Sequence, residues 1–258
     1  MENARQPDTV IRIRNLSKRF GRQVIFDRLD LDVHRGEVLG IAGASGTGKS
    51  VLLRSIIGLM PPDEGSVEIF GRDIAALDRR GRQDIEHRWG VLFQDGALFS
   101  SLTVLQNIQV PMREQLKLPK AAMDELAFLK MSMVGLSPDA AHKYPSELSG
   151  GMRKRAGLAR ALALDPEIVF LDEPTSGLDP IGAAAFDQLI RRLQQTLGLT
   201  VYMVTHDLDS IFAICDRVAV LAGQQVVRAG TPGDLVIEPR HPWVREYFCG
   251  ERARAAMR

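Results

Sequence analysis

The chain has 258 residues, 45% of them hydrophobic, which is enough to bury the core of one large α/β domain without disulfides or a structural metal. Its 33 Lys and Arg against 32 Asp and Glu give a formal charge of +1, which excludes a global field that would draw the protein onto nucleic acid or a membrane surface. The two cysteines, Cys215 and Cys249, lie outside any CxxC or Cys/His cluster, which indicates a reducing compartment and argues against a zinc site.

The N-terminal part predicts an antiparallel β layer. The first twenty residues lack the apolar core of a signal peptide, and no apolar run in the chain approaches the roughly 18 residues of a membrane span, so we expect a cytosolic or peripheral protein. Residues 10–13 and 24–33 alternate apolar and polar side chains, as half-buried strands do, and residues 35–37 form the turn after them.

A buried strand, a glycine-rich loop and a helix follow. Residues 37–42 are nearly all apolar, as in a strand covered on both faces, and the helical pattern begins at residues 50–57. Further strands are expected at 66–70, after a turn rich in Pro and Gly, and at 89–94, so we expect the sheet to continue through residue 94.

In the middle of the chain, the spacing of apolar residues changes from a strand pattern to a helical one. Residues 103 to about 163 have apolar side chains at helical spacing and no convincing strand, which predicts an inserted helical subdomain over about 96–163. Buried-strand patterns return at 168–171, 200–204 and 217–221, so the segments before and after the insertion are expected to share one parallel sheet.

We therefore expect an α/β domain at 8–240 followed by a tail at 241–258. The tail mixes aromatic residues with Arg and Glu at helical spacing, which fits either an amphipathic helix packed on the domain or a loosely docked terminal helix.

The strongest motif is G-x-x-x-x-G-K-[ST] at positions 43–50, between the predicted strand and helix. Its glycines let backbone N–H groups turn toward phosphates, while Lys49 reaches the β/γ oxygens and Ser50 ligates Mg²⁺. The alternative is a glycine-rich turn that matches by chance. The expected ATP-binding residues of this loop are Gly43, Ala44, Ser45, Gly46, Thr47, Gly48, Lys49, Ser50 and Val51.

Two carboxylates end the predicted strand at 168–171. Mg²⁺ beside a triphosphate needs such oxygens at the carboxyl edge of a sheet, so we expect Asp172 to hold Mg²⁺, mostly through water. Glu173 points elsewhere and is expected to polarise the attacking water as general base; the alternative is a second acid around the metal or a solvated side chain.

A second anion site is expected where Ser149, Gly150 and Gly151 begin a helix. Because the helical insertion holds this site away from the phosphate loop, one chain cannot wrap both around one nucleotide, whereas a second copy approaching head-to-tail can. The sequence therefore predicts ATP at a dimer interface.

Taken together, the motifs resemble those of the ABC ATPase family over roughly residues 10–235. The resemblance rests on the phosphate loop, Gln94, the segment Leu148-Ser149-Gly150-Gly151-Met152, Asp172-Glu173, Ser176-Gly177-Leu178-Asp179 and His206, in that order. It implies a P-loop NTPase with a RecA-like mixed sheet, an N-terminal antiparallel β layer and an inserted helical subdomain, acting as an ATP hydrolase of the translocase class with ATP and Mg²⁺ as cofactors.

The resemblance also implies roles for further residues. Phe20 would stack on adenine, although it could also be a core phenylalanine. Gln94 would sense the γ-phosphate and ligate Mg²⁺. His206 would contact the γ-phosphate, although it could instead cap the helix beginning near Asp207. Asp179, with Ser149, Gly150 and Gly151, would reach the nucleotide of the second copy. The implied catalytic set is Glu173, His206, Gln94 and Lys49.

Within the family, residues 91–104, 111–114 and 151–155 are similar to the ATPases of Mla-type phospholipid transporters. That implies transport of phospholipid between the membranes of a Gram-negative-type envelope, at the cytoplasmic face of the inner membrane, with a permease and an MCE-domain lipid-binding protein as partners and no nucleic acid. The alternatives are the ATPase of a solute importer, or a soluble non-transport ABC ATPase acting on ribosomes or nucleic acid. In the segment Gly96-Ala97-Leu98-Phe99 the two larger apolar side chains could also simply pack the hinge of the insertion.

Overall fold

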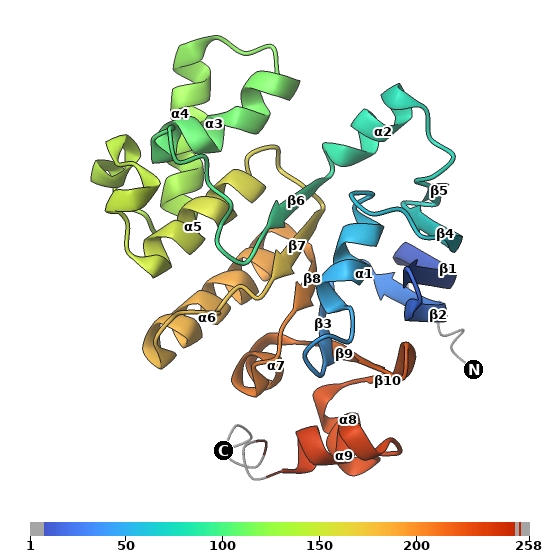
Figure 1. Cartoon of the computed structure of the whole chain (residues 1–258). Helices are drawn as coiled ribbons and strands as arrows, with labels where there is room; N and C mark the ends of the chain where they lie inside the picture. The colour runs from blue at the N-terminus through green and yellow to red at the C-terminus, as the bar shows by residue number, and fades with distance from the viewer. Residues whose placement is uncertain (1–7, 251–252, 254–258) are drawn as a thin grey trace, which may run out of the picture.

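The computed structural model describes residues 8–250 and residue 253, and its strands form two sheets (Figure 1). The antiparallel sheet has the order β2-β1-β4-β5, and its strands are β1 (Thr9–Phe20), β2 (Gln23–His34), β4 (Glu64–Ile69) and β5 (Arg72–Asp73). The expected N-terminal antiparallel layer is thereby confirmed. The expectation that residues 66–70 and 89–94 continue one sheet is wrong, because β4 pairs with β1, where Val67 and Ile69 are buried.

The second sheet has the order β10-β9-β3-β8-β7-β6, parallel except for β10, which pairs antiparallel with β9. Its strands are β3 (Val38–Gly43), β6 (Trp89–Leu92), β7 (Ile168–Asp172), β8 (Thr200–Val204), β9 (Arg217–Ala222) and β10 (Gln225–Gly230). The predicted sharing of one sheet by segments on both sides of the insertion is confirmed. Sequence patterning missed β10 because this edge strand has no fully buried side chain.

Both faces of the parallel sheet are covered, which explains the nearly continuous apolar runs in its strands. In β7, Ile168 and Phe170 face helix α1 (Lys49–Ile56) and the antiparallel sheet. Val169 and Leu171 face the helices on the other side. The sheet therefore separates two apolar clusters, and α1 fills the space between the two sheets.

The remaining helices lie mostly on the second face of the parallel sheet and beside β6, where α3, α4 and α5 group together (Figure 1). They are α2 (Arg79–Glu86), α3 (Val104–Gln115), α4 (Lys120–Met133), the 3₁₀ turns η1 (Pro138–His142) and η2 (Pro145–Glu147), α5 (Gly150–Ala161), α6 (Pro180–Leu197), α7 (Leu208–Ile214), α8 (Pro232–Ile237) and α9 (Pro242–Cys249). The segment between β6 and β7 is thus a helical insert, and its helix α3 begins at a capping box of Thr103 and Gln106.

The C-terminal helix α9 packs on the domain with Val244 and Phe248 fully buried against the larger apolar cluster. Residues 251–252 and 254–258 of the predicted tail lie outside the described residues. Of the helices in the described part of the chain, none is long and apolar enough to cross a membrane.

Candidate functional site

The predicted site residues converge on the carboxyl edge of the parallel sheet. The phosphate loop follows β3, Asp172 ends β7, His206 follows β8 and Gln94 follows β6. Because these strands are parallel neighbours in the order β3-β8-β7-β6, their carboxyl ends meet at one edge, where α/β proteins bind ligands.

The phosphate loop has the backbone that an anion cradle needs. Gly46 and Gly48 have φ of 79° and 95°, which side-chain-bearing residues rarely adopt. A Cβ on Gly48 would also lie 2.6 Å from Ile25 and 2.8 Å from Phe26. Gly48 is the N-cap of α1 and has no side-chain oxygen to offer, so the first N–H groups of this helix can face a phosphate.

The lysine of the loop is folded back onto it. Lys49 Nζ donates to the carbonyl oxygens of Gly43 at 2.8 Å and Ala44 at 3.0 Å. Burial lowers the pKa of Lys49, and the carboxylates of Glu173 and Asp172 oppose this shift by favouring the ammonium form. The cation thus lies at the mouth of the loop, where it can exchange carbonyl oxygens for phosphate oxygens.

Ser50 and Asp172 form a pair of hard oxygen ligands. Ser50 Oγ donates to Asp172 Oδ1 at 3.0 Å, and Asp172 is only 5% exposed. Within the described ranges, no group of three or more His, Cys, Asp or Glu side chains could hold a metal by itself. A hydroxyl beside one carboxylate fits Mg²⁺, which keeps water and phosphate oxygens as its other ligands. Gln94, the third predicted ligand, is exposed in the loop after β6.

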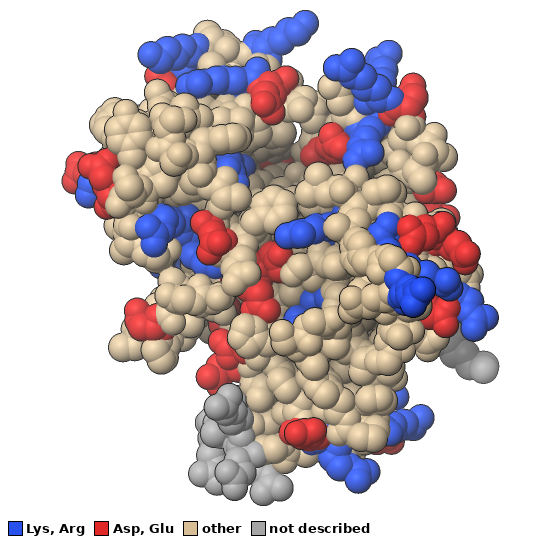
Figure 2. Space-filling model, in the orientation of Figure 1, with Lys and Arg blue, Asp and Glu red and all other residues tan. Residues whose placement is uncertain are grey.

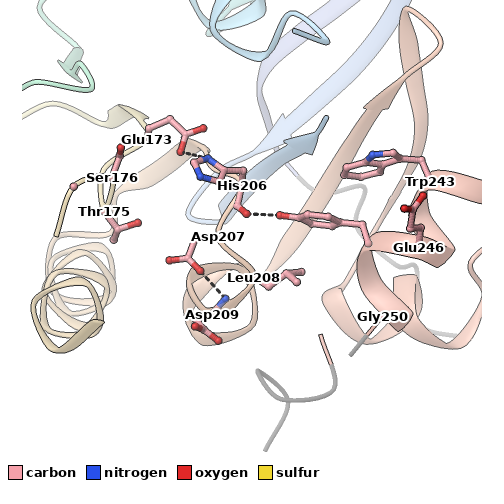
Figure 3. A pocket seen from close by; sticks show the side chains of 12 residues that line it. Glu173, Thr175, Ser176, His206, Asp207, Leu208, Asp209, Trp243, Glu246 and Gly250 are labelled. Atoms are coloured by element: carbon pink, nitrogen blue, oxygen red, sulfur yellow. Dashed lines mark hydrogen bonds and ion pairs between the residues drawn. The ribbon is translucent and has the colours of Figure 1, made fainter. Parts of the chain in front are cut away.

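Glu173 and His206 face each other at the end of the sheet (Figure 3). Glu173 Oε2 lies 2.7 Å from His206 Nδ1, with the Glu173 side chain 15% exposed and that of His206 67% exposed. The N-cap of α7 is Asp207, which accepts the N–H of Asp209 at 3.0 Å. The alternative that His206 caps this helix is therefore wrong. The His206 ring instead pairs with the Glu173 carboxylate and can orient it.

A cavity of about 920 Å³ opens beside this pair, between residues 173–177, residues 206–209 and helix α9 (Figure 3). Tyr247 of α9 donates its hydroxyl to the carbonyl oxygen of His206 at 2.6 Å and stacks on Trp243 with ring centroids 4.5 Å apart. Sequence reasoning missed Tyr247, although an aromatic residue at helical spacing in the tail was a visible signal. The cavity wall includes Glu173 and His206 but not the residues of the phosphate loop.

The predicted in-trans residues lie together on another part of the surface. Ser149 is the exposed N-cap of α5 and accepts the N–H of Met152 at 3.3 Å. A Cβ on Gly150 would lie 3.9 Å from the carbonyl oxygen of Gly177, so the start of α5 lies beside the segment before α6. Asp179 is the N-cap of α6 and accepts the N–H of Gly182 at 2.9 Å. Helix α5 packs on α3, α4 and β6, whereas α1 packs on β3, β7 and β8.

The ring of Phe20 is 45% exposed at the end of β1, so the alternative of a core phenylalanine is wrong. Lys18 Nζ lies 5.8 Å from the centre of the ring. An exposed ring at a strand end can offer a face to a base.

Two cations of α5 were not predicted as site residues. Lys154, 6% exposed, donates to the carbonyl oxygens of Gln94 and Glu173, and Arg160 donates to those of Gly96 and Ala97. Lys154 shares a helix face with the buried Leu158 at four residues' spacing, and that spacing was the available sign that this lysine is buried.

Comparison with known proteins gives consistent matches. The family model described as ABC transporter matches residues 26–176. The chain is 41% identical, over 94% of its length, to the probable ribonucleotide transport ATP-binding protein mkl of Mycobacterium leprae and spans 69% of that protein. It is 40% identical, over 88% of its length, to the intermembrane phospholipid transport system ATP-binding protein MlaF of Haemophilus influenzae and spans 86% of it. The solved dimer of the bacterial ABC transporter cassette MJ0796 superposes with a TM-score of 0.79 at 31% identity, over 86% of this chain and 98% of that one.

Proposed function

The chain belongs to the ABC transporter family as an ATP-binding and ATP-hydrolysing subunit, and on this premise we propose that it drives phospholipid between the two membranes of a Gram-negative-type envelope. The observation that supports phospholipid as the cargo is the 40% identity with a phospholipid transport subunit, which extends over most of both chains. The protein would then lie at the cytoplasmic face of the inner membrane, attached through a permease that is associated with an MCE-domain lipid-binding protein.

In the proposed hydrolytic step, the residues at the carboxyl edge of the sheet bind the phosphates, hold Mg²⁺ and activate the attacking water. The N–H groups of the phosphate loop and the ammonium of Lys49 hold the phosphates. Ser50 and Asp172, with Gln94, would hold Mg²⁺, which when bound neutralises charge on the β- and γ-phosphate oxygens. The Glu173 carboxylate accepts a proton from the attacking water, and His206 orients that carboxylate through Nδ1 and contacts the γ-phosphate.

The same proposal gives the start of α5 a role in a second copy. Its N-cap Ser149 is exposed, its first glycines carry no side chains, and Asp179 lies close by on the segment before α6. These groups would complete the nucleotide site of a partner copy, as the head-to-tail arrangement requires. Closing the two copies around two nucleotides would then pull on the permease, and hydrolysis would release them.

A groove between β6 and α3 offers a place for a permease helix. It has a volume of about 320 Å³ and is lined by Trp89, Phe99 and Pro111 among others. Phe99 is 52% exposed there, whereas Leu98 packs against the apolar cluster. Of the two larger apolar side chains in the segment 96–99, Leu98 therefore packs the insertion and Phe99 is available to a partner.

One observation favours a different cargo. The mkl proteins, which match at 41% identity over 94% of this chain, are named for ribonucleotide transport. Under this proposal the cargo contacts belong to the membrane subunits, so the ATPase sequence does not distinguish the two cargoes. A non-transport role on ribosomes or nucleic acid is disfavoured by the net charge of +1 and by the interspersed positive and negative side chains on the face drawn in Figure 2.

Purification from the native cell tests the cargo. The chain would be tagged at its N-terminus, extracted from membranes in mild detergent, and its co-purifying proteins and lipids identified by mass spectrometry against an untagged strain. A permease with an MCE-domain protein and enriched phospholipid supports the proposal. A solute-binding protein without lipid would redirect it to nutrient import, and ribosomes or repair factors without a permease would refute transport.

A further inference from the structure

Lys154 is a buried lysine that links two loops of the hydrolytic site. It lies in α5, five residues after the N-cap Ser149, and is 6% exposed. Its ammonium donates to the carbonyl oxygen of Glu173 at 3.0 Å and to that of Gln94. One side chain of the helical insert thus holds the backbone after both β6 and β7.

The Glu173 backbone needs such support. Its φ of 50° is in the left-handed region, which is strained for a non-glycine residue and persists only where the surroundings impose it. The N–H of Glu173 donates to the carbonyl oxygen of Val204 at 2.9 Å, and its own carbonyl accepts from Lys154. The backbone N–H and C=O of Glu173 are therefore both held, in the conformation that directs the carboxylate to His206.

The loop after β6 is held by the same face of α5. Arg160 donates to the carbonyl oxygens of Gly96 at 2.9 Å and Ala97 at 2.7 Å. A Cβ on Gly157 would lie 2.6 Å from Leu92 and 3.2 Å from the backbone of Gly96, so the helix fits closely against the loop. Lys154 is the one of these three α5 residues that also reaches Glu173.

Burying an ammonium against carbonyl oxygens costs the free energy of its hydration, which an apolar side chain at the same position would not lose. Burial lowers the pKa of Lys154, and the carboxylates of Asp95, Glu173 and Asp172 oppose that shift. The burial of Lys154 is therefore explained by its hydrogen bonds to the two loops, not by apolar packing.

We propose that Lys154 is a positioning residue through which helix α5 sets the backbones of Gln94 and Glu173, so that engagement of the Ser149 end of the helix by a second copy controls hydrolysis in its own chain. The inference rests on the proposed ATPase function and adds a physical link between the two nucleotide sites of the dimer. Lys154 touches no reacting atom in this arrangement and acts only through the two loops.

The test compares Lys154→Met with Lys154→Gln in the purified full chain. Met keeps the length and apolar stem but removes the donors, whereas Gln is neutral and retains two N–H donors. The matched control is Lys130→Met, because Lys130 is also buried in the insert, at 3% exposure, but its ammonium pairs with Asp165 at 2.5 Å instead of with the site loops. Turnover, affinity for a fluorescent ATP analogue and thermal unfolding are measured for each variant.

We expect Lys154→Met to lower the turnover number by about 10- to 100-fold, the range produced by small misplacement of catalytic groups, with nucleotide affinity within about twofold of wild type. Lys154→Gln is expected to recover most of the turnover. Turnover of Lys154→Met within twofold of Lys130→Met, equal losses in Lys154→Gln and Lys154→Met, or turnover that only follows thermal stability would each overturn the inference.

The link to the second copy has its own readout. If Ser149 and Lys154 act on one path, the double variant Ser149→Ala with Lys154→Met turns over scarcely more slowly than the slower single variant, whereas independent effects multiply. Multiplying losses would overturn the coupling. A wild-type chain that neither binds nor hydrolyses ATP would instead refute the proposed function, so the two failures are distinguishable.

Discussion

Removing the charge of Asp187 should stabilise the protein at neutral pH. Asp187 lies in α6 and is 3% exposed. Its Oδ2 accepts from Ser210 Oγ at 2.7 Å, but its Oδ1 has no hydrogen-bond partner among the described residues. Burial raises the pKa of Asp187 to about 6, with Asp207 and Asp209 adding to the shift and the Ser210 hydrogen bond opposing it.

Proton linkage decides whether the free energy of unfolding rises or falls with pH. Because the folded-state pKa of about 6 lies above the ordinary value of 3.8, the folded protein binds this proton more tightly than the unfolded chain between those values. The free energy of unfolding therefore falls as pH rises from about 4 to 6 and stays lower above that. Roughly two pKa units correspond to about 3 kcal/mol at neutral pH.

Asp187→Asn removes the charge and keeps an oxygen for Ser210. The hydrogen bond to a neutral amide is weaker by about 1 kcal/mol, so we expect a net gain of about 1–2 kcal/mol at pH 7.5 that shrinks to nothing near pH 4. Urea unfolding followed by circular dichroism from pH 4 to 8 measures it, with the exposed Asp84→Asn as control. A variant that is no more stable than wild type at pH 7.5, or a gain that does not change with pH, would refute the reasoning.

Three further predictions concern the nucleotide site. Glu173→Gln should lower turnover by roughly 10²–10⁴-fold, the usual effect of losing a general base, while preserving ATP binding and trapping a dimer in size-exclusion chromatography; unchanged turnover would exclude Glu173 from that role. Lys49→Ala should weaken ATP binding by roughly 10-fold or more in an equilibrium titration, since a charge-assisted contact to phosphate is lost, and normal affinity would contradict the phosphate-loop assignment. Tyr247→Phe removes the 2.6 Å hydrogen bond to His206 and should lower the melting temperature by about 2–4 °C without altering ATP affinity; a melting curve identical to wild type would count against this contact.

Much of the site could be predicted from the sequence because the residues that bind phosphate and Mg²⁺ lie in short continuous segments. The phosphate loop needs glycines at positive φ, and Gly46 and Gly48 have such angles. The carboxylates follow a strand whose apolar run already indicated burial on both faces, and Asp172 and Glu173 do lie at its end. These features depend on neighbours within about ten residues, so local patterning reveals them.

Edge elements and long-range contacts were harder to predict. Strand β10 has half-buried side chains without a strict alternation, and helix α2 is mostly exposed, so neither has a strong apolar period. The assignment of β4 to a separate sheet is decided by its pairing with β1, about fifty residues earlier in the chain.

By itself, the sequence determined the family, the phosphate loop, the acidic strand end and the helical insert, since each is a local pattern of residue types. Only the tertiary structure decided that Lys154 holds the backbones of Gln94 and Glu173, and that Tyr247 reaches the carbonyl oxygen of His206. Their partners are backbone carbonyl groups, which every residue possesses. Sequence spacing can indicate that Lys154 and Tyr247 are buried, but it does not reveal which carbonyl groups they contact, because those contacts form only when the folded chain brings distant segments together.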